Sequence, residues 1–351
     1  MNLNDIRFIK QIDAGNMLHH IDTLPDQLSA AWDLGKHLPL PKWNTIKKVI
    51  ISGMGGSAIG GDLVSGYLSS FCSVPILVSR DYDIPAWANS DDTLFIASSH
   101  SGNTEETISS YHQAVQRGCK ILTISTGGEL TELAKRDGYP AWVFRHDGMP
   151  RAAVGYSFGL ILAVLSKLGL IPDQTEQISR AVADMKQQQI LYEPEINENE
   201  NYAKQLASQF YGKWICIFGS GHVAPVARSW KGQINELAKA WAQFDILPEA
   251  DHNTLAGTKE PSEYLKNTIA VFLNTTLDHV RNQKRAKLTA DIFSQDGIQC
   301  ESVMAKGDNL LSQIWTTLHL GDYVSFYLSV LYQVDPTPIL ALQNFKKAMT
   351  Q

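Results

Sequence analysis

The sequence predicts an α/β protein made of two three-layer αβα subdomains with mostly parallel, doubly wound sheets. Apolar, strand-like runs alternate with helical stretches from residue 48 onward. Strands that alternate with helices form mostly parallel sheets that helices cover on both faces. A polar, acidic stretch at residues 193–201 interrupts this alternation, and the pattern then restarts. At 351 residues the chain is long enough for two domains of ordinary size.

The first half begins with a helical segment and continues as alternating strands and helices. Residues 1–40 are amphipathic and helical in pattern, and Pro39 and Pro41 end the segment. The helical stretch at 152–168 is the most apolar of the chain but too short to cross a bilayer, so it predicts a core helix. We expect strands at 48–52, 75–79, 93–98, 121–125 and 141–144, and helices at 58–70, 104–117, 129–136 and 152–168.

The second half repeats the order strand, glycine turn, helix, strand. This echo indicates a degenerate internal duplication rather than a short-period repeat. The second half lacks a Ser-rich second loop, so we expect only the first half to hold a phosphate. The expected elements are a strand at 214–218, a turn at 219–221, a helix from Val223 to Ala242, a strand at 269–273, and helices at 278–294 and 310–333, before a final helix with Lys346 and Lys347. The expected organisation is an N-terminal helical segment (1–40), a first domain (41–190) and a second domain with the C-terminal helix (191–351).

Composition and charge restrict the class of protein. Hydrophobic residues make up 44% and charged residues 19%, as in ordinary globular proteins. The net charge of −6 argues against a nucleic-acid surface. The four cysteines are widely spaced without a C-x-x-C pair, which favours free thiols in a reducing cytoplasm. The first residues lack the basic start and apolar core of a signal peptide. We therefore expect a cytoplasmic protein without membrane or nucleic-acid partners.

Two glycine- and hydroxyl-rich loops follow strands of the predicted first sheet. Residues 53–57 (Gly-Met-Gly-Gly-Ser) come after the strand at 48–52, and residues 99–104 (Ser-His-Ser-Gly-Asn-Thr) come after the strand at 93–98. Each loop leads into a helix, whose start offers free N–H groups and about half a positive charge. Loops at the carboxyl ends of neighbouring strands converge on one crevice. The pattern predicts a phosphate site of neutral donors from Gly56, Ser57, Ser99, Ser101 and Thr104.

The same residues bear on other interpretations of these loops. Neither loop has the Gly-Lys-Ser/Thr of a P-loop, and the first loop lacks the acidic ribose partner of a dinucleotide fingerprint. A purely structural role stays open, because glycine-rich turns are common and Asn103 with Glu106 fits a capping box. The histidines include no H-x-x-x-H spacing that would predict a metal site.

Three motifs resemble the sugar isomerase (SIS) domain, and specifically its bifunctional phosphoglucose/phosphomannose isomerase branch. They are residues 53–62 (Gly-Met-Gly-Gly-Ser-Ala-Ile-Gly-Gly-Asp), 101–107 (Ser-Gly-Asn-Thr-Glu-Glu-Thr) and 150–156 (Pro-Arg-Ala-Ala-Val-Gly-Tyr). The resemblance runs from about residue 45 to the end. One departure is His100, where many relatives carry an aromatic residue. Further matches are Asn235-Glu236, Asp251-His252-Asn253, Asp335-Pro336 and Phe345-Lys346.

The resemblance implies two SIS-type subdomains and an aldose–ketose isomerase that needs no metal or cofactor. Its substrates would be glucose 6-phosphate, mannose 6-phosphate and fructose 6-phosphate. Glu236 would be the base for proton transfer between C1 and C2, and Arg151 would face the enediolate. His252 and Lys346 would open the sugar ring. In relatives this histidine serves the neighbouring subunit, which implies a homodimer.

Non-catalytic interpretations of the same residues stay open. Without the resemblance, Glu236 reads as a solvated helical carboxylate, His252 as a solvated loop histidine and Lys346 as a surface lysine. Two other functions compete: a non-catalytic sensor of sugar phosphates, and an SIS enzyme for another (amino) sugar phosphate, either an isomerase or a glutamine-dependent aminotransferase partner. A sensor would be expected to lose those three residues, and a transferase to carry an N-terminal cysteine-nucleophile domain.

Overall fold

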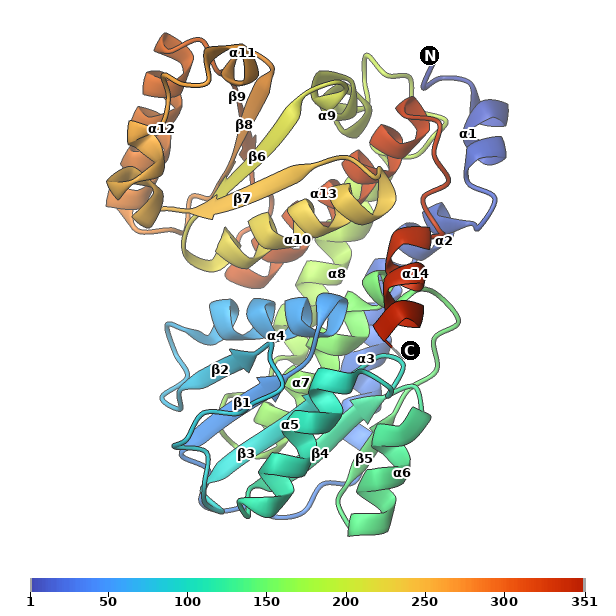
Figure 1. Ribbon diagram of the computed structural model, residues 1–351, viewed down its shortest axis with the longest axis vertical. Coiled ribbons are helices and arrows are strands. Elements are labelled where there is room, and N and C mark those ends of the chain that lie inside the picture. The colour runs from blue at the N-terminus through green and yellow to red at the C-terminus, as the bar shows by residue number, and fades with distance from the viewer. Residues whose placement is uncertain (1, 350–351) are drawn as a thin grey trace. The chain divides into compact units, whose positions relative to one another are not determined.

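The computed structural model describes residues 2–349, which divide by contacts into two compact units. One unit holds residues 23–185 and 306–315. The other holds the chain up to Asp22, residues 186–305, and the chain from Thr316 onward. Both units combine separate stretches of the chain, whereas the boundaries expected from the sequence divide it into consecutive segments. We call them the β1–β5 unit and the β6–β9 unit, after their sheets (Figure 1).

The β1–β5 unit contains a five-stranded parallel sheet in the order β2-β1-β3-β4-β5. All six residues of β3 are buried, as expected for a central strand that is covered on both faces. The sheet confirms the parallel α/β class. Its strands lie close to the predicted ranges: β1 (Lys48–Ser52), β2 (Ile76–Ser79), β3 (Thr93–Ser98), β4 (Lys120–Ser125) and β5 (Ala141–Val143).

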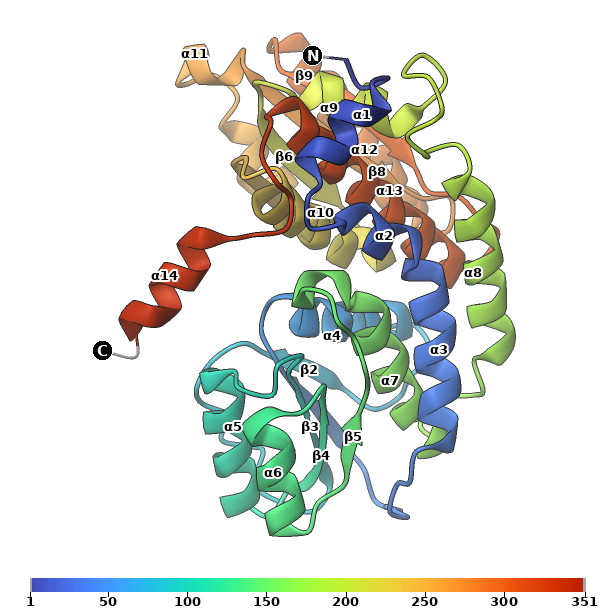
Figure 2. The same cartoon turned by 90° about the vertical axis from the view of Figure 1, so that its right-hand side faces the viewer.

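Helices cover both faces of this sheet. Tyr111 of α5 (Glu105–Gln116) and Leu130 of α6 (Gly128–Asp137) pack on one face with Phe95. On the other face lie α4 (Gly55–Leu68) and α7 (Val154–Lys167), as Figure 2 shows. Nearly all of α7 is buried, which confirms the predicted core helix. Further helices are α3 (Leu24–His37) and α8 (Thr175–Gln189), with the 3₁₀ turn η1 (Pro150–Ala152) before α7.

The β6–β9 unit contains a four-stranded parallel sheet in the order β7-β6-β8-β9. Phe218 of β6 stacks on Phe272 of β8, and Phe293 of α12 packs edge-on against Phe218. The strands are β6 (Trp214–Gly219), β7 (Ala242–Ile246), β8 (Thr268–Asn274) and β9 (Gln299–Met304). The helices are α1 (Ile6–Ile12), α2 (Met17–Asp22), α9 (Tyr202–Phe210), α10 (Ala224–Leu237), α11 (Ser262–Leu265), α12 (Val280–Gln295) and α14 (Leu340–Met349), with 3₁₀ turns η2 (Gly221–Val223), η3 (Glu249–His252) and η4 (Thr254–Ala256). Helix α13 (Leu310–Leu331) begins in the β1–β5 unit and belongs to the β6–β9 unit from Thr316 onward.

The helix predicted from Val223 to Ala242 is shorter than expected. It ends at Leu237, because Lys239 has the left-handed φ of 55° that stops a helix. The ammonium of Lys239 donates hydrogen bonds to the carbonyls of Glu236 and Leu237 at that end. Ala242 then starts strand β7, which the sequence analysis did not predict; it also missed β9, α8 and α9.

The two sheets share one strand order. β2-β1-β3-β4 corresponds to β7-β6-β8-β9, and only β5 has no counterpart. The internal duplication inferred from the sequence is therefore present in three dimensions. In the part of the chain that the structure describes, no helix is long and apolar enough to span a membrane.

Candidate active site

The two loops of the predicted phosphate site meet at the carboxyl ends of β1 and β3. These strands are direct neighbours, with Ser52 opposite Ala97. A Cβ on Gly53 would lie 2.7 Å from the carbonyl oxygen of Ser98, so only glycine allows this close approach. The buried Ser57 hydroxyl accepts a hydrogen bond from the His100 amide at 3.2 Å. The first loop is thus tied to the second by direct contacts.

The hydroxyls of the second loop differ in what they are available to do. The Ser99 side chain is buried; it accepts the Gly102 amide at 3.1 Å and pairs with the Thr104 hydroxyl at 2.8 Å. Ser101 is exposed and its oxygen accepts the Asn103 amide at 3.2 Å, which leaves its O–H able to donate to a ligand. Ser99 therefore shapes the loop, and Ser101 has a donor to offer. Thr104 can also donate to a ligand when Ser99 is the donor in their shared hydrogen bond.

The capping box considered for Asn103 and Glu106 does not hold this loop. Asn103 Oδ1 instead accepts the amide of Glu129, at the start of α6, at 2.9 Å. Gly102 has a φ of +69°, and a Cβ there would lie 1.8 Å from the carbonyl oxygen of Gly127. The second loop is therefore shaped by packing against the turn before α6, which leaves Thr104 as the N-cap of α5.

Arg151 lies beside the mouth of α4. It sits in η1 and is only 5% exposed. A Cβ on Gly56 would come within 2.6 Å of the Pro150 carbonyl oxygen and 3.3 Å of Arg151 Cα. The glycine thus lets η1 pack directly on the first loop. A buried guanidinium therefore lies next to a helix N-terminus, and its charge adds to the partial positive charge of the helix start.

An aromatic and histidine cluster adjoins the second loop, and the sequence analysis identified only His100 of it. His100 Nε2 lies 3.0 Å from His146 Nδ1, and burial lowers the pKa of His100. The His100 ring also meets Phe144 edge-on, and Phe144 stacks on Tyr156 at 4.9 Å between ring centroids. An aromatic ring suits this position because the His100 side chain packs against the rings of Phe144 and His146. Tyr156 belongs to the 150–156 motif, which was the one available signal.

The other three predicted catalytic residues belong to the β6–β9 unit. Glu236 is half-buried near the end of α10. His252 is exposed at the end of η3, where Asp251 anchors the turn through Arg285 and Thr289, each at 2.8 Å. Lys346 is exposed on α14. The two loops predicted to bind phosphate and Arg151, in contrast, belong to the β1–β5 unit. Among residues 2–349, no group of three or more His, Cys, Asp or Glu side chains is placed to hold a metal ion.

Comparison with known proteins gives the family. Residues 199–349 match the model of the bacterial phospho-glucose isomerase C-terminal SIS domain. A bifunctional phosphoglucose/phosphomannose isomerase of Caldicellulosiruptor bescii is 39% identical over 340 residues, which are 95% of this chain and 99% of that protein. The chain belongs to the family of bifunctional phosphoglucose/phosphomannose isomerases. The resemblance identified from the sequence is thereby confirmed.

Further matches agree with this family and its fold. The enzyme of the same name from Aquifex aeolicus is 33% identical over 86% of this chain and 90% of its own length. The crystal structure of a hypothetical protein from Thermus thermophilus superposes with a TM-score of 0.75 at 14% identity, over 98% of this chain and 93% of that one. At such identity the structural match supports the fold alone. The roles of the individual site residues stay predictions.

Proposed function

We propose that the chain interconverts glucose 6-phosphate and mannose 6-phosphate with fructose 6-phosphate. Family membership supports this activity, since the relatives carry the name bifunctional phosphoglucose/phosphomannose isomerase. The observation that carries the proposal is the meeting of both loops and Arg151 at one corner of the first sheet, through Gly53 and Gly56. That corner offers backbone amides, hydroxyls and one buried guanidinium, which together fit a phosphorylated sugar.

The proposed binding step uses the first sheet. The N-terminus of α4 with Gly56 and Ser57 would donate to the phosphate from one side, and the Ser101 and Thr104 hydroxyls from the other. Ser99 would keep Thr104 in place through their shared hydrogen bond. A neutral donor set holds the substrate without the strong charge pairing that would slow its release.

The proposed chemistry is proton transfer in two stages. His252 and Lys346 would open the ring by moving protons between the ring oxygen and the anomeric hydroxyl. Glu236 would then carry a proton between C1 and C2 through an enediolate, and Arg151 would stabilise its negative charge without exchanging protons. Positioned acid–base groups contribute about 10²–10⁴-fold each. Both aldoses would share one base if the enediol turns about its C2–C3 bond.

The base assignment is tested by Glu236→Gln. The variant should bind fructose 6-phosphate but lose deuterium exchange from solvent into the sugar, measured by NMR with a chelator present. Glu263→Gln, at an exposed position of α11, is the matched control and should exchange like wild type. Wild-type exchange in Glu236→Gln would reject the assignment. Formation of both aldoses from fructose 6-phosphate by the wild-type protein tests the activity itself.

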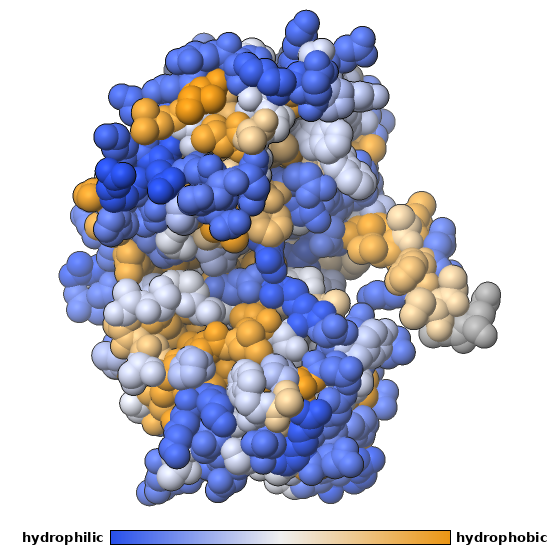
Figure 3. Space-filling model, turned by 60° about the vertical axis from the view of Figure 1, so that its left-hand side comes forward, coloured by the Kyte–Doolittle hydropathy of each residue, from blue (hydrophilic) through white to orange (hydrophobic). Residues whose placement is uncertain are grey.

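We further propose that the active form is a homodimer in the cytoplasm. Helix α14 has no buried residue, and Leu340, Leu342, Phe345 and Met349 are all exposed. Figure 3 shows these hydrophobic side chains gathered along the helix. A ten-residue helix has only marginal stability by itself in water. Packing of its apolar side chains against a partner would stabilise it, and we propose that this partner is a second copy of the chain. The four free cysteines support a reducing compartment.

Mixed dimers test whether His252 serves the neighbouring subunit. A dimer of one Glu236→Gln chain and one His252→Ala chain would keep one site with both wild-type residues if the histidine comes from the partner. Mixing the two inactive variants should then restore activity, up to half of the wild-type value per mixed dimer. No recovery in verified mixed dimers would place His252 in the site of its own chain.

A further inference from the structure

The second sheet carries a close copy of the phosphate loops' backbone. Gly55 stands two residues after Gly53, which follows β1, and Gly221 stands two residues after Gly219, which ends β6; their φ angles are +51° and +52°. Ser52 pairs with Ala97, and Phe218 with Phe272, directly before these turns. Counting seven residues on from Ala97 and from Phe272 reaches the N-caps of α5 and α12, so the two second loops also have equal length.

The space over the glycine turn is open in one copy and filled in the other. A Cβ on Gly55 would meet no atom within 4 Å. A Cβ on Gly221 would lie 2.7 Å from a carboxylate oxygen of Asp278. The second unit thus places a negatively charged side chain where the first unit leaves room for the phosphate of a substrate.

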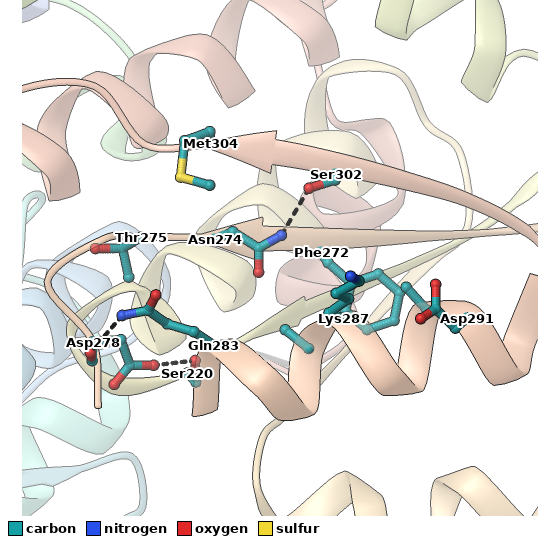
Figure 4. Close-up of a pocket in the computed structure, with 12 residues that line it drawn as sticks. Ser220, Phe272, Asn274, Thr275, Asp278, Gln283, Lys287, Asp291, Ser302 and Met304 are labelled. Carbon is teal, nitrogen blue, oxygen red and sulfur yellow. Dashed lines mark hydrogen bonds between the residues drawn. The ribbon is translucent and has the colours of Figure 1, made fainter. Parts of the chain in front are cut away.

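The Asp278 carboxylate is bound as an anion at that place. The Ser220 hydroxyl, from the glycine turn, donates to it, as the dashed line in Figure 4 marks. The His279 amide donates at 2.7 Å and the Asn282 side chain at 3.3 Å, both from the start of α12. A helix start is favourable for negative charge. The carboxylate therefore takes donors from both loops, as a bound oxyanion would.

The course of the second loop explains why this side chain turns inward. By the register, Asp278 corresponds to Asn103, and Leu277 to Gly102. Gly102 has a positive φ and turns Asn103 toward α6, whereas Leu277 has no positive φ. Without the left-handed residue, the loop directs the Asp278 side chain back over Gly221.

A cavity of about 400 Å³ adjoins this carboxylate and opens between α12 and the ends of β8 and β9. The small side chains of Ala286 and Ala290 on α12 leave space for the cavity. Asn274 of β8 also lines it and donates a hydrogen bond to the Ser302 hydroxyl of β9 at 2.8 Å (Figure 4). Its charged lining consists of Asp278, Lys287 and Asp291, which sum to one negative charge. Solvent and small solutes therefore reach the place that Asp278 occupies.

We propose that the second sheet retains an oxyanion-binding position between its glycine turn and the start of α12, and that the Asp278 carboxylate occupies this position in place of a ligand. The chain then binds one phosphate, at the first sheet, and the cavity of the second sheet rejects anionic ligands. The inference rests on the phosphate role proposed for the loops of the first sheet, since it compares the oxyanion-binding positions of the two sheets.

The test uses inorganic phosphate and three proteins. Asp278→Ser removes the carboxylate and leaves space for an anion. Asp278→Asn removes the charge, but its side chain still occupies the oxyanion-binding position. Phosphate should raise the Tm of Asp278→Ser by about twice the wild-type increase or more, because a second anion binds the folded state. Asp278→Asn should respond like wild type. Folding of Asp278→Ser only in phosphate buffer would be the same rescue in a stronger form. A response of Asp278→Ser no larger than that of wild type, in Tm or folded yield, overturns the proposal.

Crystals soaked in tungstate, a heavier tetrahedral oxyanion, locate the sites separately. Asp278→Ser should show an anomalous peak at Ser220 and Gly221 that wild type lacks, while the peak at Ser57 and Thr104 is common to both. Absence of the peak at the first loops in both proteins would count against the proposed function. Absence of the peak at Ser220 alone would reject only the role of Asp278. Isomerase activity should be unchanged in Asp278→Ser.

Discussion

Acid should destabilise the protein through one buried histidine on α13. His319 is fully buried, and its Nε2–H donates to the Ile21 carbonyl at 2.9 Å. Its Nδ1 has no hydrogen-bond partner among the described residues. Protonation would place both a charge and an unsatisfied N–H in the core. Burial accordingly lowers the pKa of His319 from 6.5 to about 4.

The size and direction of the effect follow from this difference. Below pH 6.5 His319 is protonated in the unfolded chain, whereas in the folded chain it stays neutral until the pH falls to about 4. The contribution that His319 makes to stability is therefore fully present above pH 6.5 and is lost as the pH falls toward 4. At about 1.4 kcal/mol for each pKa unit, the complete loss is about 3.5 kcal/mol, and about 2.5 kcal/mol is already lost at pH 4.5.

Urea unfolding between pH 4.5 and 8 measures this loss. In His319→Gln, the side-chain amide can still donate to the Ile21 carbonyl but cannot be protonated. The difference in unfolding free energy between wild type and His319→Gln should therefore shrink by about 2.5 kcal/mol from pH 7.5 to pH 4.5. His37→Gln, at an exposed position of α3, is the control and should run parallel to wild type. Parallel curves for His319→Gln and wild type would refute the reasoning.

Three further predictions address other parts of the molecule. Burial raises the pKa of Asp322 to about 7, so the contribution of Asp322 to stability falls as the pH rises from about 4 to 7, opposite in sign to that of His319. Asp322→Asn should remove this contribution, so the unfolding free energy of the variant should rise relative to that of wild type between about pH 4 and 7. Gly56→Ala should lower kcat/KM roughly tenfold or more, because about 1–3 kcal/mol of overcrowding would push the Arg151 segment off the loop. Gly232→Ala, in open space on α10, should instead add about 0.5–1 kcal/mol of stability with unchanged kinetics. His252→Ala should slow turnover of the closed-ring sugar more than that of an open-chain analogue; equal effects on both would remove His252 from ring opening.

Strands in the interior of the sheets were predictable, and strands at the edge of the second sheet were not. β1, β3, β6 and β8 are buried on both faces and read as continuous apolar runs. β7 and β9 are the two edges of their sheet, where solvent meets one side of the strand. They contain Asp245 and Glu301, which break the apolar run. An edge strand forms because it pairs with the neighbouring strand, so its own sequence pattern is a weaker signal.

The sequence by itself determined the fold class, the positions of the two glycine- and hydroxyl-rich loops and the family, because each depends on residues that are neighbours in the chain. Tertiary structure alone decided which groups those loops meet. The contact of Gly56 with η1, the pairing of His100 with His146, and the carboxylate of Asp278 over Gly221 all join residues more than forty positions apart. No local pattern encodes such contacts, since they exist only once parallel strands bring their carboxyl ends to the same edge of a sheet.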